Sequence, residues 1–269
     1  MSVDSIALIA GNGIYPEMFA TAARRAGVET LVAAAFKDET KPELADMVNA
    51  IEWFRVGQLN KMIAFFKKHS VKHAVMVGQI APKNLFDLRP DFRTLIMLAR
   101  LKKRNAESLF GAIGDELAKD GIELLPATTF LEDFIPKAGH VAGPHPKKRR
   151  HEDAQYGFEI AKASSKLDIG QTVVVKNGTV LAVEAFEGTN EAVKRGGALG
   201  KGKATMVKVS KAGQDMRFDV PVIGPDTITS AAESGVDVIA IEAGKTLILD
   251  QTEVFRRCAE LQVSLLAIE

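Results

Sequence analysis

The sequence is almost free of cysteine, with Cys258 as its one thiol. A single cysteine excludes an intrachain disulfide framework and fits a reducing compartment. Cys258 lies in EVFRRCAEL, a stretch with helical periodicity. A small buried apolar residue on a helix is favoured there over a nucleophile.

Long apolar runs are also missing, since no stretch approaches the roughly 18–20 uninterrupted apolar residues that a membrane span requires. The amino-terminal MSVDSIALIAGNG has no basic residue and carries Asp4, and its apolar run is only as long as a strand. We therefore expect no signal peptide. The sequence predicts a cytoplasmic protein, with any membrane contact peripheral.

An excess of charge of one sign is absent too. The 35 Lys and Arg residues balance 34 Asp and Glu residues, for a formal net charge of +1. Such a balance predicts no nucleic-acid partner. A length of 269 residues allows one large domain or two modest ones.

The first part of the sequence alternates strand-like and helix-like segments. Two consecutive βαβ units can be traced, followed by two amphipathic helices and a short strand. Parallel strands joined by helices predict a doubly wound, Rossmann-like sheet, which binds ligands beyond the carboxyl ends of its strands. The strands are expected at 6–10, 30–36, 50–54, 73–77 and 122–125, and the helices at 16–26, 59–69, 92–103 and 107–119.

Proline and glycine cluster after residue 125 and predict a linker at 131–150. The linker separates a Rossmann-like α/β domain at 1–130 from a mixed α+β domain at 151–269. In the second domain, a helix is expected at 153–164. An Asn177-Gly178 dipeptide between two strand-like runs predicts a β-hairpin.

Gly11, Asn12 and Gly13 follow the first strand and precede the first helix. Glycines at such a turn can let backbone amides face a phosphate, but they can equally serve a tight turn. The dinucleotide fingerprint is incomplete because its third glycine falls on Pro16. A nicotinamide-dependent oxidoreductase would rest on this turn alone.

The stretch GQDMRFDVPVIGPDT at 213–227 has the alternation of a strand. Asp215, Arg217 and Asp219 would share one face, and Met216 and Phe218 would share the other. One interpretation is a half-buried strand with a compensated outer face, worth little in stability. The other is a face that presents carboxylates to a divalent cation and a guanidinium to a phosphate.

Two further segments each allow two interpretations. The basic run PHPKKRRH at 144–151 is either a solvated loop or a patch for anionic phosphates or lipid headgroups. In VEAFEGT, Glu184 and Glu187 precede Gly188-Thr189, which is either an ordinary helix N-cap or a phosphate contact.

Five segments, in this order, resemble one family over nearly the whole chain. They are LIAGNG, FRVGQLNKMI, LDIGQTVVV, VEAFEGT and QDMRFDVPVIG. The family is the UDP-2,3-diacylglucosamine pyrophosphatase of the lipid A pathway, in the form unrelated to calcineurin-like metallophosphatases.

The resemblance implies a Mg²⁺-dependent hydrolase that converts UDP-2,3-diacylglucosamine into UMP and 2,3-diacylglucosamine 1-phosphate (lipid X). It also implies a lipid product held between two domains and a homodimer, and it leaves open a peripheral contact with the inner face of the inner membrane. The family's essential aspartate falls on Asp219. The implied catalytic residues are Asp219, Arg217 and Asp215, and the implied metal ligands are Asp219, Asp215 and Glu187. The implied substrate-binding residues are Gly11, Asn12, Gly13, Gln58, Gly78, Gln171, Gly188, Thr189, Lys208 and Gln214.

The sequence departs from the family pattern at two places. Asn190 stands where the family usually has aspartate after Gly-Thr, and Asn105-Ala106-Glu107 stands in place of Gly-Asp-Asp. Two alternatives therefore stay open. One is a lipid or nucleotide-sugar binding relative without chemistry, and the other is a hydrolase of a different nucleotide sugar.

Overall fold

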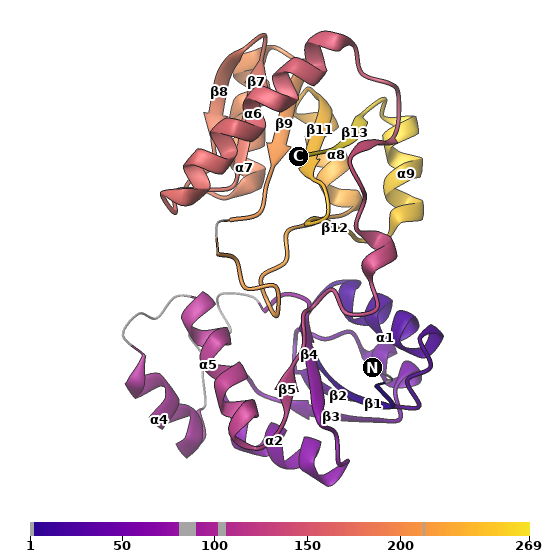
Figure 1. Ribbon diagram of the computed structural model, residues 1–269, viewed down its shortest axis with the longest axis vertical. Coiled ribbons are helices and arrows are strands. Elements are labelled where there is room, and N and C mark those ends of the chain that lie inside the picture. The colour runs from indigo at the N-terminus through magenta and orange to yellow at the C-terminus, as the bar shows by residue number, and fades with distance from the viewer. Residues whose placement is uncertain (1–2, 81–89, 102–105, 212) are drawn as a thin grey trace. The chain divides into compact units, whose positions relative to one another are not determined.

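The computed structural model of the chain describes residues 3–80, 90–101, 106–211 and 213–269 (Figure 1). The chain divides into two compact units. Unit 1 is Met1–Leu131 together with Asp215–Asp219, and unit 2 is Glu132–Gln214 together with Val220–Glu269. The segment that carries the expected catalytic motif therefore groups with the first unit. This differs from the domain division expected from the sequence, which places the segment in the domain at 151–269.

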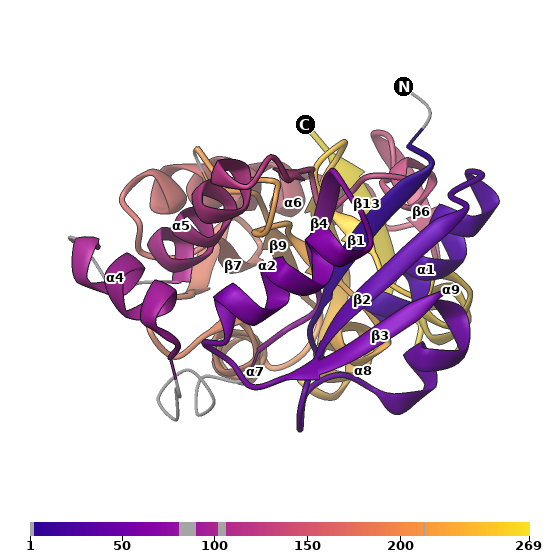
Figure 2. The ribbon, with the colours of Figure 1, turned by 90° about the horizontal axis from the view of Figure 1, so that it is seen from below.

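Unit 1 is built on a five-stranded parallel sheet in the order β3-β2-β1-β4-β5. Figure 2 shows β1, β2 and β3 side by side. The strand order reverses between β1 and β4, which is the switch point where doubly wound sheets bind ligands. The predicted Rossmann-like fold is confirmed. The strands are β1 (Ser5–Ala10), β2 (Thr30–Phe36), β3 (Ala50–Phe54), β4 (His73–Val77) and β5 (Glu123–Leu124).

Helices pack on both faces of this sheet. On one face Ile9 joins a core with Phe66 of α2 and Leu117 of α5. On the other face Leu8 is fully buried, as is Phe19 of α1, because successive strand residues point in opposite directions. The helices are α1 (Tyr15–Arg25), η1 (Pro42–Met47), α2 (Leu59–Lys68), α4 (Phe92–Arg100) and α5 (Ala106–Lys119). The helix expected at 92–103 thus ends at Arg100, and residues 102–105, including Asn105, lie outside the described residues.

Unit 2 contains a six-stranded mixed sheet in the order β6-β13-β11-β9-β7-β8. The central pairs β13/β11 and β11/β9 are parallel, and the outer pairs are antiparallel. Asn177 and Gly178 join β7 to β8 with φ of 53° and 72°, as a two-residue hairpin turn requires. The predicted hairpin is confirmed. The strands are β6 (Gly139–Ala142), β7 (Thr172–Lys176), β8 (Thr179–Val183), β9 (Ala204–Lys208), β11 (Val236–Glu242) and β13 (Ser264–Ile268).

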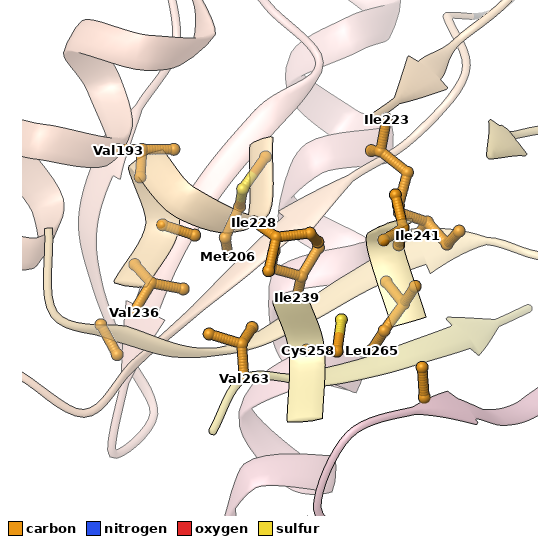
Figure 3. Close-up of a cluster of buried hydrophobic side chains, with 14 of the residues drawn as sticks. Val193, Met206, Ile223, Ile228, Val236, Ile239, Ile241, Cys258, Val263 and Leu265 are labelled. Atoms are coloured by element: carbon orange, nitrogen blue, oxygen red, sulfur yellow. The ribbon is translucent and has the colours of Figure 1, made fainter. Parts of the chain in front are cut away.

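Two cores fill unit 2, one on each face of its sheet. Helix α6 covers one face, and helices α7, α8 and α9 cover the other, where Ile228, Ile239, Cys258 and Leu265 lie close together (Figure 3). Cys258 is fully buried, as expected, and burial raises the pKa of its thiol to about 11. The remaining elements are η2 (Glu132–Phe134), α6 (Lys148–Lys166), α7 (Thr189–Gly200), β10 (Val222–Ile223), α8 (Pro225–Glu233), β12 (Leu247–Ile248) and α9 (Gln251–Glu260).

The segment expected as a linker contributes to unit 2. Strand β6 pairs with β13, and α6 begins at Lys148. Within the basic run, Arg150 lies 3.2 Å from Asp153 and 3.3 Å from Asp237, with only 13% of its side chain exposed. The interpretation as a solvated loop is therefore wrong for Arg150, which is an ion-paired side chain on the first turn of a helix.

The expected strand around the Asp215 motif is a turn. The amides of Phe218 and Asp219 donate to the Asp215 carbonyl over 3.2 and 2.9 Å, and the Arg217 amide donates to Asp215 Oδ1 over 3.1 Å. An aspartate that binds the backbone two residues ahead is a standard turn device. The local hydrogen bonds of Asp215 thus replace the sheet ladder that the alternation suggested.

None of the helices in the described ranges is both long and apolar enough to cross a membrane.

Candidate functional site

Unit 1 contains a largely apolar cavity at the carboxyl ends of its parallel strands. Its walls come from the ends of β1, β2 and β4 and from helices α2, α4 and α5. The cavity volume is about 100 Å³, several times the ~10–15 Å³ that one water molecule needs. Most of the lining side chains are aliphatic, aromatic or methionine, for example Met62, Met76, Met97 and Phe110. A pocket of this composition favours a hydrophobic ligand.

Three of the residues expected to bind substrate line this cavity, namely Gly11, Gln58 and Gly78. Gln58 stands directly before α2 and accepts a hydrogen bond from the Arg55 amide at 2.9 Å. Asn12 is the fourth expected residue near this edge and is exposed. The motif that resembles the family therefore lies at the ligand-binding edge of the sheet.

The glycines of this edge are explained by a close approach of two backbone segments. A Cβ on Gly11 would lie 2.5 Å from the Gln79 carbonyl oxygen, and one on Gly78 would lie 2.7 Å from the Asn12 carbonyl oxygen. Asn12 and Gln79 form an isolated bridge between the two segments. The Gly13 amide is occupied by Asn12 Oδ1 at 2.6 Å. Of the two interpretations of the glycine turn, a tight turn and a phosphate contact, the tight turn accounts for these contacts.

The segment Asp215–Asp219 contributes to the same cavity. Phe218 lines it and packs against Phe110 of α5, with 5.9 Å between the ring centroids. The Met216 carbonyl accepts a hydrogen bond from the Ala127 amide at 2.8 Å. These contacts fix the turn against unit 1, and Arg217 and Asp219 are the sequence neighbours of the ring that lines the cavity.

Asp215 and Arg217 form a bidentate pair. Arg217 Nε lies 3.0 and 3.1 Å from the two Asp215 oxygens, and a second guanidinium nitrogen lies 2.7 Å from Oδ2. These hydrogen bonds lower the pKa of the Asp215 carboxyl and raise the pKa of Arg217. Both oxygens of Asp215 are thus engaged. The pair is an ion pair in which the third guanidinium nitrogen is not bonded to Asp215. That nitrogen can donate to another acceptor.

The Asp219 carboxylate has a different environment. It is partly buried, and no residue in the described part of the chain gives it a hydrogen bond or an ion pair. A partly buried carboxylate without a protein partner can accept from water or bind a cation. Asp219 is the acid of this turn that remains available for chemistry.

A second group of expected residues gathers in unit 2, where β8 leads into α7. The Thr189 hydroxyl donates to Glu184 Oε1 at 2.8 Å, and the Gln171 amide lies 3.4 Å from Glu184 Oε2. Gly188 precedes the helix with φ of 82°. The Thr189 hydroxyl therefore bonds Glu184 instead of capping α7, which does not match the interpretation as an ordinary N-cap.

Glu187 is also engaged within this turn. Arg195 donates to its Oε1 at 2.6 Å, and the Ala185 amide donates to its Oε2 at 3.1 Å. Its own backbone amide and Arg195 lower the pKa of the Glu187 carboxyl. Glu187 is therefore a paired surface acid.

Three other expected residues of unit 2 are partly or wholly buried at their polar ends. Lys208 Nζ donates to the Val222 carbonyl at 3.2 Å. Gln171 Oε1 and Gln214 Nε2 are buried and have no hydrogen-bond partner within the described ranges of the chain. Buried polar atoms are normally paired. These two orphan atoms therefore mark positions where a ligand atom could complete the bonding.

The expected metal ligands divide between the two units, with Asp215 and Asp219 in unit 1 and Glu187 in unit 2. Over the residues that the structure describes, no group of three or more His, Cys, Asp or Glu side chains could hold a metal ion. Asp215 and Glu187 are each held by an arginine. The geometry therefore suits an ion held by one protein carboxylate together with ligand oxygens, and it does not suit a closed protein cage.

Sequence reasoning missed the apolar lining of the cavity. Phe218 was assigned only to the inner face of a strand, and α4 only to an amphipathic helix. The available signal was the density of apolar residues in FRTLIMLAR, which exceeds what one buried helix stripe needs.

Comparisons with known proteins agree along the whole chain. The model of the LpxI N-terminal domain matches residues 5–134, and that of the LpxI C-terminal domain matches residues 137–266. The UDP-2,3-diacylglucosamine pyrophosphatase LpxI of Caulobacter vibrioides is 28% identical over 275 residues, covering 98% of this chain and 97% of that protein.

The similarity to solved structures is weak. A biotin carboxylase domain from Hydrogenobacter thermophilus matches 66% of this chain and 36% of its own, with a TM-score of 0.29 and 11% identity. A biotin carboxylase from Campylobacter jejuni matches 72% of this chain and 41% of its own, with a TM-score of 0.30 and 11% identity. At these scores the likeness carries no functional argument.

Proposed function

The chain belongs to the LpxI family, and we propose on that basis that it is a UDP-2,3-diacylglucosamine pyrophosphatase of lipid A synthesis. Water cleaves the bond between the two phosphates of UDP-2,3-diacylglucosamine. The products are UMP and 2,3-diacylglucosamine 1-phosphate, also called lipid X. The relative from Caulobacter vibrioides carries this substrate in its name.

One observation supports this function above the others. The ring of Phe218 lines an apolar cavity at the switch point of the unit 1 sheet, and the residues on either side of it are Arg217 and Asp219. A hydrophobic hollow lined by a residue whose sequence neighbours are an arginine and an aspartate suits a ligand that is apolar at one end and a diphosphate at the other. A diacylated nucleotide sugar has this composition.

The residues of the turn have distinct roles in the proposal. Arg217 binds a phosphate oxygen through the guanidinium nitrogen that Asp215 leaves available. Asp215 is a positioning residue, because its two oxygens hold that guanidinium in place. Asp219 orients the attacking water or holds the cation that stabilises developing charge on the phosphates.

The arrangement fits the expected Mg²⁺ with a single protein carboxylate as its ligand. Magnesium is commonly bound through one or two carboxylates and completes its shell with substrate phosphates and water. Asp219 would be the protein ligand. When bound, the ion would neutralise phosphate charge during hydrolysis.

We assign a second set of substrate-binding groups to unit 2. Gln171 and Gln214 have buried polar atoms that lack partners among the residues that the structure describes. Gly188, Thr189 and Lys208 provide a turn and a cation of the kind that binds phosphate or ribose oxygens. The proposal includes the cytoplasmic location, the homodimer and the peripheral membrane contact that the sequence led us to expect.

The test is incubation of the purified protein with UDP-2,3-diacylglucosamine, with Mg²⁺ or with EDTA, followed by mass detection of both products. We expect UMP and lipid X in equal amounts, with Mg²⁺ raising the rate. UDP-N-acetylglucosamine, which lacks the long acyl chains, serves as the matched substrate control and should turn over far more slowly.

Asn190, in place of the family's usual aspartate, favours one competing function, a binding protein without chemistry. That function predicts tight lipid X binding and no turnover at any Mg²⁺ concentration. Preferential hydrolysis of the unacylated UDP-sugar would instead indicate a hydrolase of another nucleotide sugar.

A further inference from the structure

Helix α4 exposes an apolar face to solvent. The exposed fractions are 78% for Phe92, 51% for Leu95 and 37% for Ile96. These positions follow the i, i+3, i+4 spacing that places side chains on one side of a helix. We define Phe92, Leu95 and Ile96 as the α4 outer face.

The opposite side of the same helix is apolar as well. Met97 is buried, and Thr94, Met97 and Leu98 line the cavity of unit 1. A helix of a water-soluble domain normally carries polar residues opposite its buried stripe. Helix α4 therefore has two apolar sides, and only one of them packs against the rest of unit 1.

The exposure is not a result of a detached helix. Asp91 accepts hydrogen bonds from the amides of Thr94 at 2.9 Å and Asn60 at 2.6 Å, and the Thr94 hydroxyl donates to the Gly57 carbonyl at 2.6 Å. Arg93 pairs with Glu116 of α5 at 2.7 Å. These bonds fasten α4 to α2 and α5 and hold its outer face toward solvent. In Figures 1 and 2 the helix lies at the margin of unit 1.

The sequence that contains this face has an excess of positive charge. Residues 92–106 contain five Lys or Arg residues and no Asp or Glu. Arg93 is neutralised by Glu116 and Asp120, whereas Arg100 is exposed at the carboxyl end of the helix. Apolar side chains beside cations are the composition of helices that lie in the interface of an anionic membrane.

We propose that the α4 outer face inserts into the headgroup region of an anionic lipid membrane and holds the protein at that surface. The inference rests on the proposed function, because a diacylated substrate resides in a bilayer and the inner side of α4 lines the cavity assigned to it. The helix that contacts the membrane is thereby a wall of the site that receives the lipid.

The basic run at 147–150 is the weaker candidate for membrane contact. Arg150 is held by Asp153 and Asp237, and Arg149 lies 3.7 Å from Glu152. This run also lacks an apolar anchor of the kind that Phe92 supplies to α4.

The test uses the full chain and sedimentation with vesicles of phosphatidylglycerol and phosphatidylcholine. The variant Phe92→Ser/Leu95→Gln/Ile96→Gln removes the apolar face. The control variant Leu167→Gln/Ile169→Gln removes two exposed apolar residues of unit 2. A second control, Lys147→Ala/Lys148→Ala, weakens the basic run.

The proposal predicts that the α4 variant binds vesicles about tenfold or more weakly than the wild type. Both control variants should bind like the wild type, and pure phosphatidylcholine vesicles should bind less. Equal binding by the α4 variant would overturn the proposal, as would a loss confined to the Lys147/Lys148 variant. Conversion of a dimer to a monomer by the α4 variant, with vesicle binding unchanged, would assign the face to a second copy of the chain and also overturn it.

Hydrolysis of substrate in detergent micelles separates this inference from the proposed function. Loss of vesicle binding with micellar turnover retained supports the membrane face. Vesicle binding through α4 without turnover by the wild type would sink the proposed function and leave the membrane face standing. Turnover by a wild type that does not bind vesicles would overturn the membrane face and leave the proposed function standing. The single change Leu95→Gln, at an exposed helix position, gives a weaker version of the same readout with the fold preserved.

Discussion

At the scale of single residues, the two acids of the 215–219 turn differ in what their carboxylates can do. Asp215 has both oxygens bound by Arg217, and the Asp219 carboxylate has no partner among the described residues. Their spacing in the sequence is symmetrical about Arg217, so spacing alone could not distinguish them, and only the family resemblance singled out Asp219. The structure distinguishes them by hydrogen bonding.

The change Asp215→Asn tests the positioning role. The amide keeps an oxygen for the Arg217 backbone but loses the charge that holds the guanidinium, since bonds to ionised groups are about twice as strong as neutral ones. We expect kcat to fall about tenfold or more, with the Mg²⁺ concentration for half-maximal rate unchanged. A large shift in that concentration would instead make Asp215 a metal ligand. Asp46→Asn, at an exposed position in η1, is the matched control.

A second residue-scale feature is a buried acid in unit 2. Glu242 Oε2 accepts from the Ser210 amide at 2.7 Å and the Ser210 hydroxyl at 2.8 Å, and Lys162 Nζ lies 3.0 Å from both oxygens. Burial alone would raise the pKa of Glu242, but these bonds together outweigh it and lower the pKa. The cluster fixes Ser210, which precedes the segment that crosses to unit 1.

We predict that Glu242→Ala lowers the free energy of unfolding at pH 7 by about 2 kcal/mol, because it leaves Lys162 and Ser210 without their charged acceptor. A lowered pKa means that this contribution is present above the ordinary glutamate pKa of 4.5 and is lost as the pH falls through the folded-state value. The stability difference between wild type and variant should therefore shrink below about pH 4.5. Urea unfolding at several pH values measures it, and a difference that grows on acidification would contradict the account.

At the scale of elements, the ligand-binding edge of unit 1 depends on how closely the segments after β1 and β4 approach. Gly78 has φ of 91°, and an added Cβ would lie 2.7 Å from the Asn12 carbonyl oxygen. Gly13 has a similar φ of 95° but no atom within 4 Å of the added Cβ. A comparison of substitutions at these two glycines thus distinguishes the effect of backbone strain from that of steric contact.

We predict that Gly78→Ala is the more damaging of the two substitutions. Gly13→Ala should cost only the strain of a left-handed alanine, about 1 kcal/mol, and should keep most activity. Gly78→Ala adds a clash with backbone that cannot rotate away. We therefore expect it to lower the melting temperature and to raise the KM for substrate. Differential scanning calorimetry and steady-state kinetics of the pair decide it. Equal effects of the two changes would argue against the close approach.

Elements with strong periodicity were predictable from sequence, and the critical turn was not. The βαβ units of unit 1 follow from strand-like and helical periods, and Asn177-Gly178 fixes the hairpin because few residues adopt two successive positive φ values. The alternation of residues 215–219 suggested a strand, yet a turn that Asp215 closes on its own backbone has the same sequence pattern. Local side-chain bonding decided the outcome, and periodicity does not report it.

At the scale of the whole molecule, one short segment links the chemistry to the fold. Unit 2 surrounds residues 215–219 in the sequence, but these residues pack with unit 1. Motif order and composition could not predict this crossing, because it depends on contacts such as Phe218 with Phe110, more than 100 residues apart in the sequence. Asp219 thereby belongs to unit 1, next in the sequence to Phe218, which lines the cavity.

The most direct test of the account is the rate of UMP release from UDP-2,3-diacylglucosamine by the wild type and by Asp219→Asn, measured side by side with their thermal unfolding. Asparagine preserves shape but binds magnesium and orients water poorly. The account predicts that the variant loses at least about 99% of the rate while its melting temperature stays near that of the wild type, since no described residue bonds the Asp219 carboxylate. Wild-type turnover in a well-folded Asp219→Asn variant would contradict it.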